Sequence, residues 1–126
     1  MADVKINLEA ANDLTVFTVE GELTANEIIS YSSEYYDNLP TSLVLWNATK
    51  GSVKNISNKD FRQIAAQMKD YTLKRKGGRT AFVSLFDLDL GLGRMYETFA
   101  GLEQLPITYG TFRTVDEAME WLFSVE

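Results

Sequence analysis

The residues best suited to chemistry lie close together in one segment. Two carboxylates, two glycines, an arginine and a tyrosine follow one another: Asp87, Asp89, Gly91, Gly93, Arg94 and Tyr96. Gly-x-Gly-Arg at the start of a helix could offer backbone amides and a guanidinium to an anion. The two aspartates could bind a hard cation, or act as an acid and a base. Alternatively, the glycines allow a tight turn and close helix–sheet packing, and an aspartate caps the helix.

Each of these chemistries lacks a necessary partner in the sequence. The segment has neither the third glycine of a dinucleotide fingerprint nor the Lys-Ser/Thr of a P-loop. Two carboxylates make a poor metal cage, and nothing supplies an oxyanion hole. The 126 residues include no histidine and no cysteine, which excludes imidazole bases, thiolate nucleophiles and iron–sulfur ligation. We therefore predict that the protein is not an enzyme, and we expect no metal and no cofactor.

An apolar pocket is a second possibility. Tyr31, Tyr35 and Tyr36 fall on one side of a helical pattern, and Leu88 and Leu92 lie within the segment described above. Tyrosine rings and leucines together could line a partly apolar cavity. Most aromatic stripes at helical spacing belong to the core, and this alternative stays open.

The elements that must position these residues alternate between strands and helices. Short β-branched and apolar runs predict strands at residues 4–8, 13–20, 42–46, 80–85 and 107–112. Apolar residues at helical spacing predict helices over residues 28–39, 61–72, 92–99 and 115–125. Leu39 and Val125 are the last apolar positions of the first and fourth patterns.

Local signals support the helix boundaries. Three helices begin with a capping box of the form Ser/Thr-x-x-Glu/Asp, at Thr24–Glu27, Ser57–Asp60 and Thr114–Glu117. Gly77 and Gly78 end the second helix. The order β-β-α-β-α-β-α-β-α predicts one α/β domain over residues 1–126, with a mostly parallel, mixed five-stranded sheet and four helices.

This topology predicts where a site would lie. Ligands of open parallel sheets bind beyond the carboxyl ends of the strands. A Gly-rich loop at residues 86–94 and an eleven-residue connection from Asn47 to Ser57 are expected at that edge. The candidate site therefore includes Ser57 and Asn58.

Charge and hydropathy limit the partners. The net charge is −6, which repels nucleic acid. A basic cluster is expected to be a solvated helix end; its members are Lys69, Lys74, Arg75, Lys76 and Arg79. With neither a signal peptide nor an apolar run of membrane-spanning length, we expect a cytoplasmic protein without stable membrane insertion. Exposed sheet edges favour a homodimer.

The ordered set of segments resembles the STAS domain family, typified by the anti-sigma factor antagonist SpoIIAA, and more narrowly the small bacterial STAS/SEC14-like proteins. The segments are residues 19–24 (VEGELT), 78–83 (GRTAFV), 91–96 (GLGRMY), 109–114 (YGTFRT) and 117–122 (EAMEWL). The resemblance implies the SpoIIAA-like fold and a regulatory role. It also places Ser57 where the antagonists carry a phosphorylated serine, although the flanking Asp-Ser-x-Gly pattern is absent.

Together these observations predict a non-catalytic regulatory or protein-interaction domain that binds a partner protein. The alternative is a carrier or sensor of a small apolar or amphipathic ligand, which the resemblance to SEC14-like lipid-binding proteins also implies.

Overall fold

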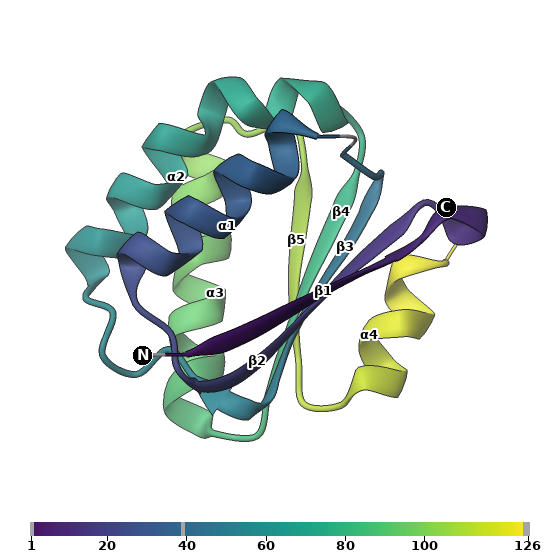
Figure 1. Ribbon diagram of the computed structural model, residues 1–126. Helices are drawn as coiled ribbons and strands as arrows, with labels where there is room; N and C mark the ends of the chain where they lie inside the picture. The colour runs from purple at the N-terminus through teal and green to yellow at the C-terminus, as the bar shows by residue number, and fades with distance from the viewer. Residues whose placement is uncertain (1, 39, 125–126) are drawn as a thin grey trace.

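A five-stranded sheet runs through the centre of the computed structural model, which describes residues 2–38 and 40–124 (Figure 1). Its strands are β1 (Asp3–Glu9), β2 (Leu14–Glu22), β3 (Leu43–Ser52), β4 (Arg79–Ser84) and β5 (Thr108–Phe112). They lie side by side in chain order. β1 is antiparallel to β2, and all other pairs are parallel. The predicted mixed α/β sheet is confirmed. Leu39 and Val125 lie outside the described residues.

The helices divide unequally between the two faces of the sheet. Helices α1 (Ala25–Asp37), α2 (Asn58–Thr72) and α3 (Asp87–Leu102) cover one face, and α4 (Val115–Leu122) covers the other (Figure 1). Three successive crossovers between adjacent parallel strands turn in the same sense, so their helices lie on one side. Short 3-10 helices join β1 to β2 (η1, Ala10–Asn12) and extend α2 (η2, Leu73–Arg75). No helix within the described ranges is long and apolar enough to cross a membrane.

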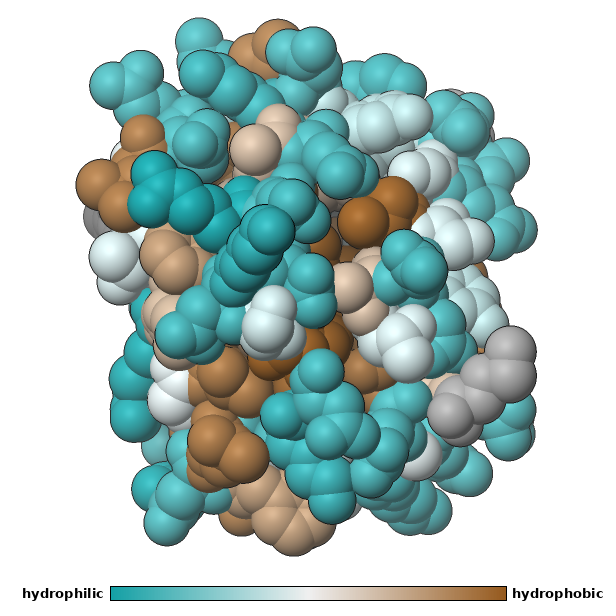
Figure 2. Space-filling model, turned by 90° about the vertical axis from the view of Figure 1, so that its left-hand side faces the viewer, coloured by the Kyte–Doolittle hydropathy of each residue, from teal (hydrophilic) through white to brown (hydrophobic). Residues whose placement is uncertain are grey.

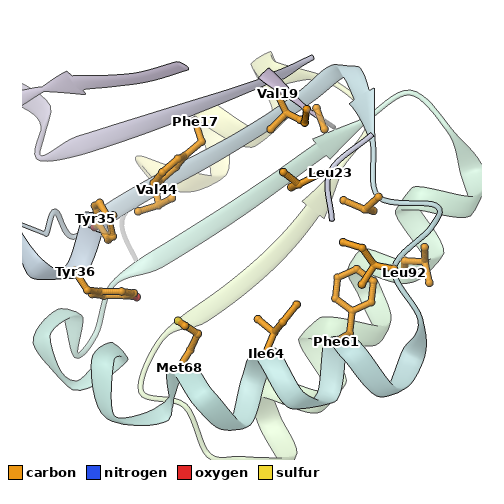
Figure 3. Close-up of a cluster of buried hydrophobic side chains, with 14 residues drawn as sticks. Phe17, Val19, Leu23, Tyr35, Tyr36, Val44, Phe61, Ile64, Met68 and Leu92 are labelled. Atoms are coloured by element: carbon orange, nitrogen blue, oxygen red, sulfur yellow. The ribbon is translucent and has the colours of Figure 1, made fainter. Parts of the chain in front are cut away.

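Each face of the sheet has its own apolar core. Val44 on β3 packs into the core beneath α1, α2 and α3, whereas its neighbour Leu45 packs into the core beneath α4. Because successive side chains of a strand point to opposite faces, β3 is buried on both sides. Figure 3 shows Phe61, Ile64 and Met68 pointing from α2 towards the sheet in the larger core.

The predicted caps form at three helices. Thr24 and Ser57 accept hydrogen bonds from the backbone amides of Glu27 and Asp60, and the acidic side chains accept in return from the cap amides. Thr114 also accepts from the Glu117 amide at 3.1 Å, but the Glu117 carboxylate accepts from the Thr114 hydroxyl rather than from its amide. The capping boxes are therefore complete at α1 and α2.

The long connection predicted from Asn47 to Ser57 is wrong, because β3 continues to Ser52. Although residues 47–52 are mostly polar, they pair in parallel with β2, and the pairing ends with Ser52 opposite Glu22. A Cβ atom on Gly51 would lie 2.8 Å from a Val19 methyl and 2.9 Å from the Gly21 carbonyl oxygen. The absence of a side chain at Gly51 thus lets the two strands approach closely where their register shifts.

The loop predicted at residues 86–94 is also wrong, because α3 begins at Asp87. Phe86 is its N-cap residue, and no side chain caps the helix. Neither Asp87 nor Asp89 is therefore the cap. Asp89 lies within the first turn of the helix, and its carboxylate accepts hydrogen bonds from residues of β3 and β4.

The outer strand is more exposed than its alternating pattern suggests. Val4 packs against the larger core, but Ile6 and Leu8 are exposed at the free edge of β1. The homodimer that such an edge favours stays a prediction.

Candidate functional site

The carboxyl ends of β3 and β4 are joined to α3 by the buried carboxylate of Asp89. Its Oδ1 accepts from Ser52 Oγ at 3.0 Å, and its Oδ2 accepts from Ser84 Oγ at 3.0 Å and from the Val53 amide at 3.3 Å. Hydrogen-bond donors satisfy the carboxylate from three directions, so it can remain buried without a cation. Asp89 has a positioning role in this arrangement.

An apolar patch lies beside this network. Leu85, Phe86 and Leu88 are 59%, 55% and 60% exposed, respectively, and we call them the carboxyl-edge patch. Phe86 and Leu88 line a hollow of about 410 Å³ together with polar residues of β2 and β3, among them Lys50, and with Lys54, which follows β3. Figure 2 shows brown side chains gathered at the lower end of the molecule, the end at which α3 begins in Figure 1.

The side chains that could serve an enzyme, namely Asp87, Asp89, Arg94 and Tyr96, are not gathered in one place. Asp87 is exposed and forms an ion pair with Arg113 at 2.8 Å, whereas Asp89 is fully buried. Arg94 is exposed on α3, and Tyr96 lines a separate internal cavity. Within the described ranges, no three acidic side chains lie close enough to hold a metal ion.

The two glycines are helical, so they form neither a tight turn nor an anion-binding loop. Gly93 faces the sheet, where a Cβ atom would lie 2.9 Å from both Phe82 Cδ2 and Thr111 Oγ1. Gly91 faces outward into open space. The prediction that the glycines allow close helix–sheet packing is therefore correct for Gly93 but not for Gly91.

Ser57 and Asn58 lie at the exposed start of α2, five residues beyond the end of β3. The Ser57 hydroxyl accepts the Asp60 amide as a helix cap. In the intervening segment, Lys54 forms an ion pair with Glu22 at 3.3 Å, and Asn55 donates to the same carboxylate at 2.6 Å. These contacts attach the segment before α2 to the end of β2.

A second hollow lies inside the protein, between the sheet and helices α1, α2 and α3. This cavity has a volume of about 120 Å³, and eight aromatic rings line it: Phe17, Tyr35, Tyr36, Trp46, Phe61, Phe82, Tyr96 and Tyr109. Figure 3 shows Tyr35 and Tyr36 at one end of this core, and Leu23 and Leu92 towards the other. Phe17 stacks on Trp46, with ring centroids 4.2 Å apart.

One end of the cavity is polar because Arg75 reaches it. The expectation that Arg75 belongs to a solvated helix end is wrong, since its side chain is only 6% exposed. Its guanidinium donates to the backbone carbonyls of Thr41, Ser42 and Arg79 and to the hydroxyls of Tyr36 and Thr80. These bonds hold the turn after α2 against the amino ends of β3 and β4.

Burial also changes the acidity of tyrosines around the cavity. Burial raises the pKa of Tyr35, although the charge of Arg75 and hydrogen bonds with Thr41 partly oppose this. Burial also raises the pKa values of Tyr96 and Tyr109, and the neighbouring Tyr109 phenol raises that of Tyr96 further. These phenols therefore remain neutral well above the usual range.

Of the five residues predicted to line an apolar pocket, Tyr35 and Tyr36 line the cavity. Tyr31 and Leu92 pack within the same core, and Leu88 is exposed in the carboxyl-edge patch. Sequence reasoning missed Arg75, although the inward stripe of α2 contained the signal. Phe61, Ile64, Met68 and Thr72 are followed at the same spacing by Arg75, which predicts an inward side chain.

Comparison with solved structures identifies the fold. The chain is similar to the anti-sigma factor antagonist SpoIIAA in its unphosphorylated form, with a TM-score of 0.53 and 13% identity over 98% of this chain and 100% of that one. It is also similar to an uncharacterized protein of the DUF3478 family from Shewanella loihica, with a TM-score of 0.58 and 18% identity over 97% and 95%. No protein-family model and no curated protein matches the sequence. The chain therefore has the SpoIIAA-like fold of STAS domains, as its segments predict.

Proposed function

We propose that this protein is a non-catalytic regulatory domain that binds a partner protein through its carboxyl-edge patch. The observation that carries the proposal is the exposure of Leu85, Phe86 and Leu88 next to one another on an acidic protein. Isolated exposed leucines are ordinary, but adjacent large apolar side chains with a polar rim are typical of protein contact sites.

The surroundings of the patch suit a specific contact. Lys50 and Lys54 line the adjoining hollow. The hydrogen bonds of Asp89 with Ser52 and Ser84 hold the first turn of α3 against the ends of β3 and β4. A rigid apolar centre with a charged rim is the usual arrangement of an interface. SpoIIAA is described as an anti-sigma factor antagonist, and its fold supports an interaction role for this chain.

Ser57 offers a means of regulating the contact. It is exposed, and its hydroxyl caps α2. A phosphate at this position would add negative charge where the helix dipole favours it. We propose Ser57 and Asn58 as the modifiable border of the interface.

Site-specific photocrosslinking tests the main proposal. A photoreactive phenylalanine derivative is placed at Leu88 and, as a matched control, at the equally exposed Leu73, in cells of the source organism. We expect one discrete covalent adduct from position 88 and none from position 73. Equal labelling from both positions, or no adduct from either, would contradict partner binding at the patch.

The internal cavity supports a second candidate function, the binding of a small apolar or amphipathic ligand. Aromatic rings line a space of about 120 Å³, which is somewhat smaller than, but of the same order as, an apolar cavity of about 150 Å³ that binds benzene. Native mass spectrometry of protein purified from its own cells tests this function. We expect a small additional mass that is lost on denaturation; the bare chain mass alone would contradict it.

A further inference from the structure

Arg75 brings a positive charge to the cavity without a counter-charge. Proteins normally pair a buried charge with one of opposite sign. Arg75 nevertheless donates only to neutral oxygens, namely three backbone carbonyls and two hydroxyls. Across residues 2–38 and 40–124, no carboxylate forms an ion pair with it. The cavity therefore has one electropositive end.

The two hydroxyls that accept from Arg75 also have protons to donate. Tyr36 Oη and Thr80 Oγ1 lie 3.1 Å and 3.0 Å from Arg75 Nη1, and both residues line the cavity. They are 5% and 6% exposed. In the described part of the chain, neither hydroxyl donates to an acceptor. Since Arg75 already occupies one lone pair of each oxygen, the missing partner is a hydrogen-bond acceptor.

Among the described residues, Glu97 is the one acidic residue that lines the cavity, and its side chain is already engaged. The carboxylate of Glu97 accepts from the Thr111 hydroxyl. Thr111 lies on β5 two residues beyond Tyr109, which is the register partner of Thr80. Glu97 therefore lines a neighbouring part of the cavity and is bonded there to Thr111. The acceptor for the hydroxyls of Tyr36 and Thr80 then has to come from a ligand or from water.

We infer that the cavity binds a small monocarboxylate with a single ring or a short chain, its carboxylate accepting from Tyr36 and Thr80 beside Arg75. This inference rests on the second candidate function and specifies its ligand class. The apolar part of the ligand lies among rings such as Phe17, Trp46 and Phe82. The guanidinium polarises both hydroxyls, and this strengthens their hydrogen bonds to an anion.

Matched pairs of probes distinguish the contribution of the carboxylate to binding from that of the apolar part of the ligand. Benzoate, phenylacetate and hexanoate are titrated beside benzyl alcohol, 2-phenylethanol and hexan-1-ol, using calorimetry. In a Trp121→Phe background, the fluorescence of Trp46 reports on the cavity alone, since Trp121 packs in the opposite core. We expect at least one carboxylate to bind about tenfold more tightly than its alcohol, the ratio that one charge-assisted hydrogen bond provides.

Variants assign the preference to the polar end. Tyr36→Phe and Thr80→Val each remove one donated proton and leave Arg75 in place, so each should reduce the carboxylate-to-alcohol ratio severalfold. Arg75→Met should abolish the ratio if the variant folds. Tyr71→Phe is the control, because the Tyr71 ring stacks on Tyr36 but does not line the cavity; it should leave the ratio unchanged.

The possible failures are distinguishable. If the alcohols bind as tightly as the carboxylates, the cavity is a ligand site but the inference about Arg75 is overturned. A preference that survives Tyr36→Phe and Thr80→Val overturns it as well. If no probe of either kind binds, water satisfies the hydroxyls, and both the inference and the second candidate function fail.

Discussion

Ser52 Oγ donates to Asp89 Oδ1 at 3.0 Å, across 37 positions of the sequence. This bond joins the last residue of β3 to the first turn of α3. The other carboxylate oxygen accepts from Ser84 on β4 and from the Val53 amide. A single buried carboxylate thus fixes the ends of two central strands relative to the helix that presents Leu88.

Replacement of Asp89 should strongly destabilise the protein. Asp89→Ala removes the acceptor from three buried hydrogen-bond donors, and we expect it to lower the free energy of unfolding by about 3 kcal/mol. Urea unfolding followed by circular dichroism measures the change. Asp87→Ala is the control: it breaks only the exposed pair with Arg113, which contributes at most about 1 kcal/mol. Equal effects of the two variants would show that the Asp89 network is not important for stability.

Alanine should have opposite effects at the two glycines of α3. At Gly91 a methyl group meets open space, so Gly91→Ala should stabilise the helix by about 0.5–1 kcal/mol. At Gly93 the same methyl group would lie 2.9 Å from Phe82 and Thr111, and we expect a loss of about 1–3 kcal/mol. Thermal unfolding of both variants measures the difference. Equal shifts in the same direction would contradict the orientation of α3.

The buried tyrosines predict a loss of stability in alkali. The folded state raises the pKa values of Tyr35, Tyr96 and Tyr109 above 10, so above that pH it holds more protons than the unfolded state. Stability is therefore unaffected by these groups below about pH 10 and falls as the pH rises further. Absorbance at about 295 nm and circular dichroism measure tyrosine ionisation and unfolding together, and part of the ionisation should accompany unfolding.

Tyr109→Phe removes one of these ionisable groups. We expect the slope of stability against pH above pH 10 to be smaller in this variant than in the wild-type protein. An unchanged slope, or complete ionisation of a protein that is still folded, would mean that the three phenols are accessible to solvent.

Ser57 should contribute to stability as a helix cap whatever its regulatory role. Ser57→Ala removes the acceptor of the Asp60 amide and should cost about 1 kcal/mol. Ser57→Asp retains an acceptor and adds a charge that the dipole favours, so it should stay close to the wild-type value. Chemical denaturation compares the two variants; similar losses in both would contradict capping by this side chain.

The order of the elements was predictable because periodicity and caps agree throughout most of the chain. Val44 and Leu45 belong to a short apolar run, and they pack on opposite faces of the sheet as such a run predicts. Thr24 and Ser57 lie at helix starts because their hydroxyls satisfy free amides. These are local effects, and a single sequence is enough to reveal them.

The candidate site was less predictable because it depends on tertiary contacts. Gly51 permits β3 to continue only because β2 lies directly beside it. An aspartate among glycines is typical of a loop, yet Asp89 is buried within a helix. It can be buried there because Ser52 and Ser84, on two strands, donate hydrogen bonds to its carboxylate. Arg75 likewise acquires its role from carbonyls at the ends of other strands. Residue types and local spacing do not determine such partners.

The sheet order repeats the chain order, and this has a consequence for how the protein emerges from the ribosome. Each new strand pairs with the one made just before it, so the sheet can extend stepwise during synthesis. The helices α1 to α3 are made between the strands and can cover their face as it forms. The opposite face, with Leu14, Leu45 and Val83, has to wait for α4. Until α4 leaves the exit tunnel, the nascent chain presents this uncovered apolar face to chaperones.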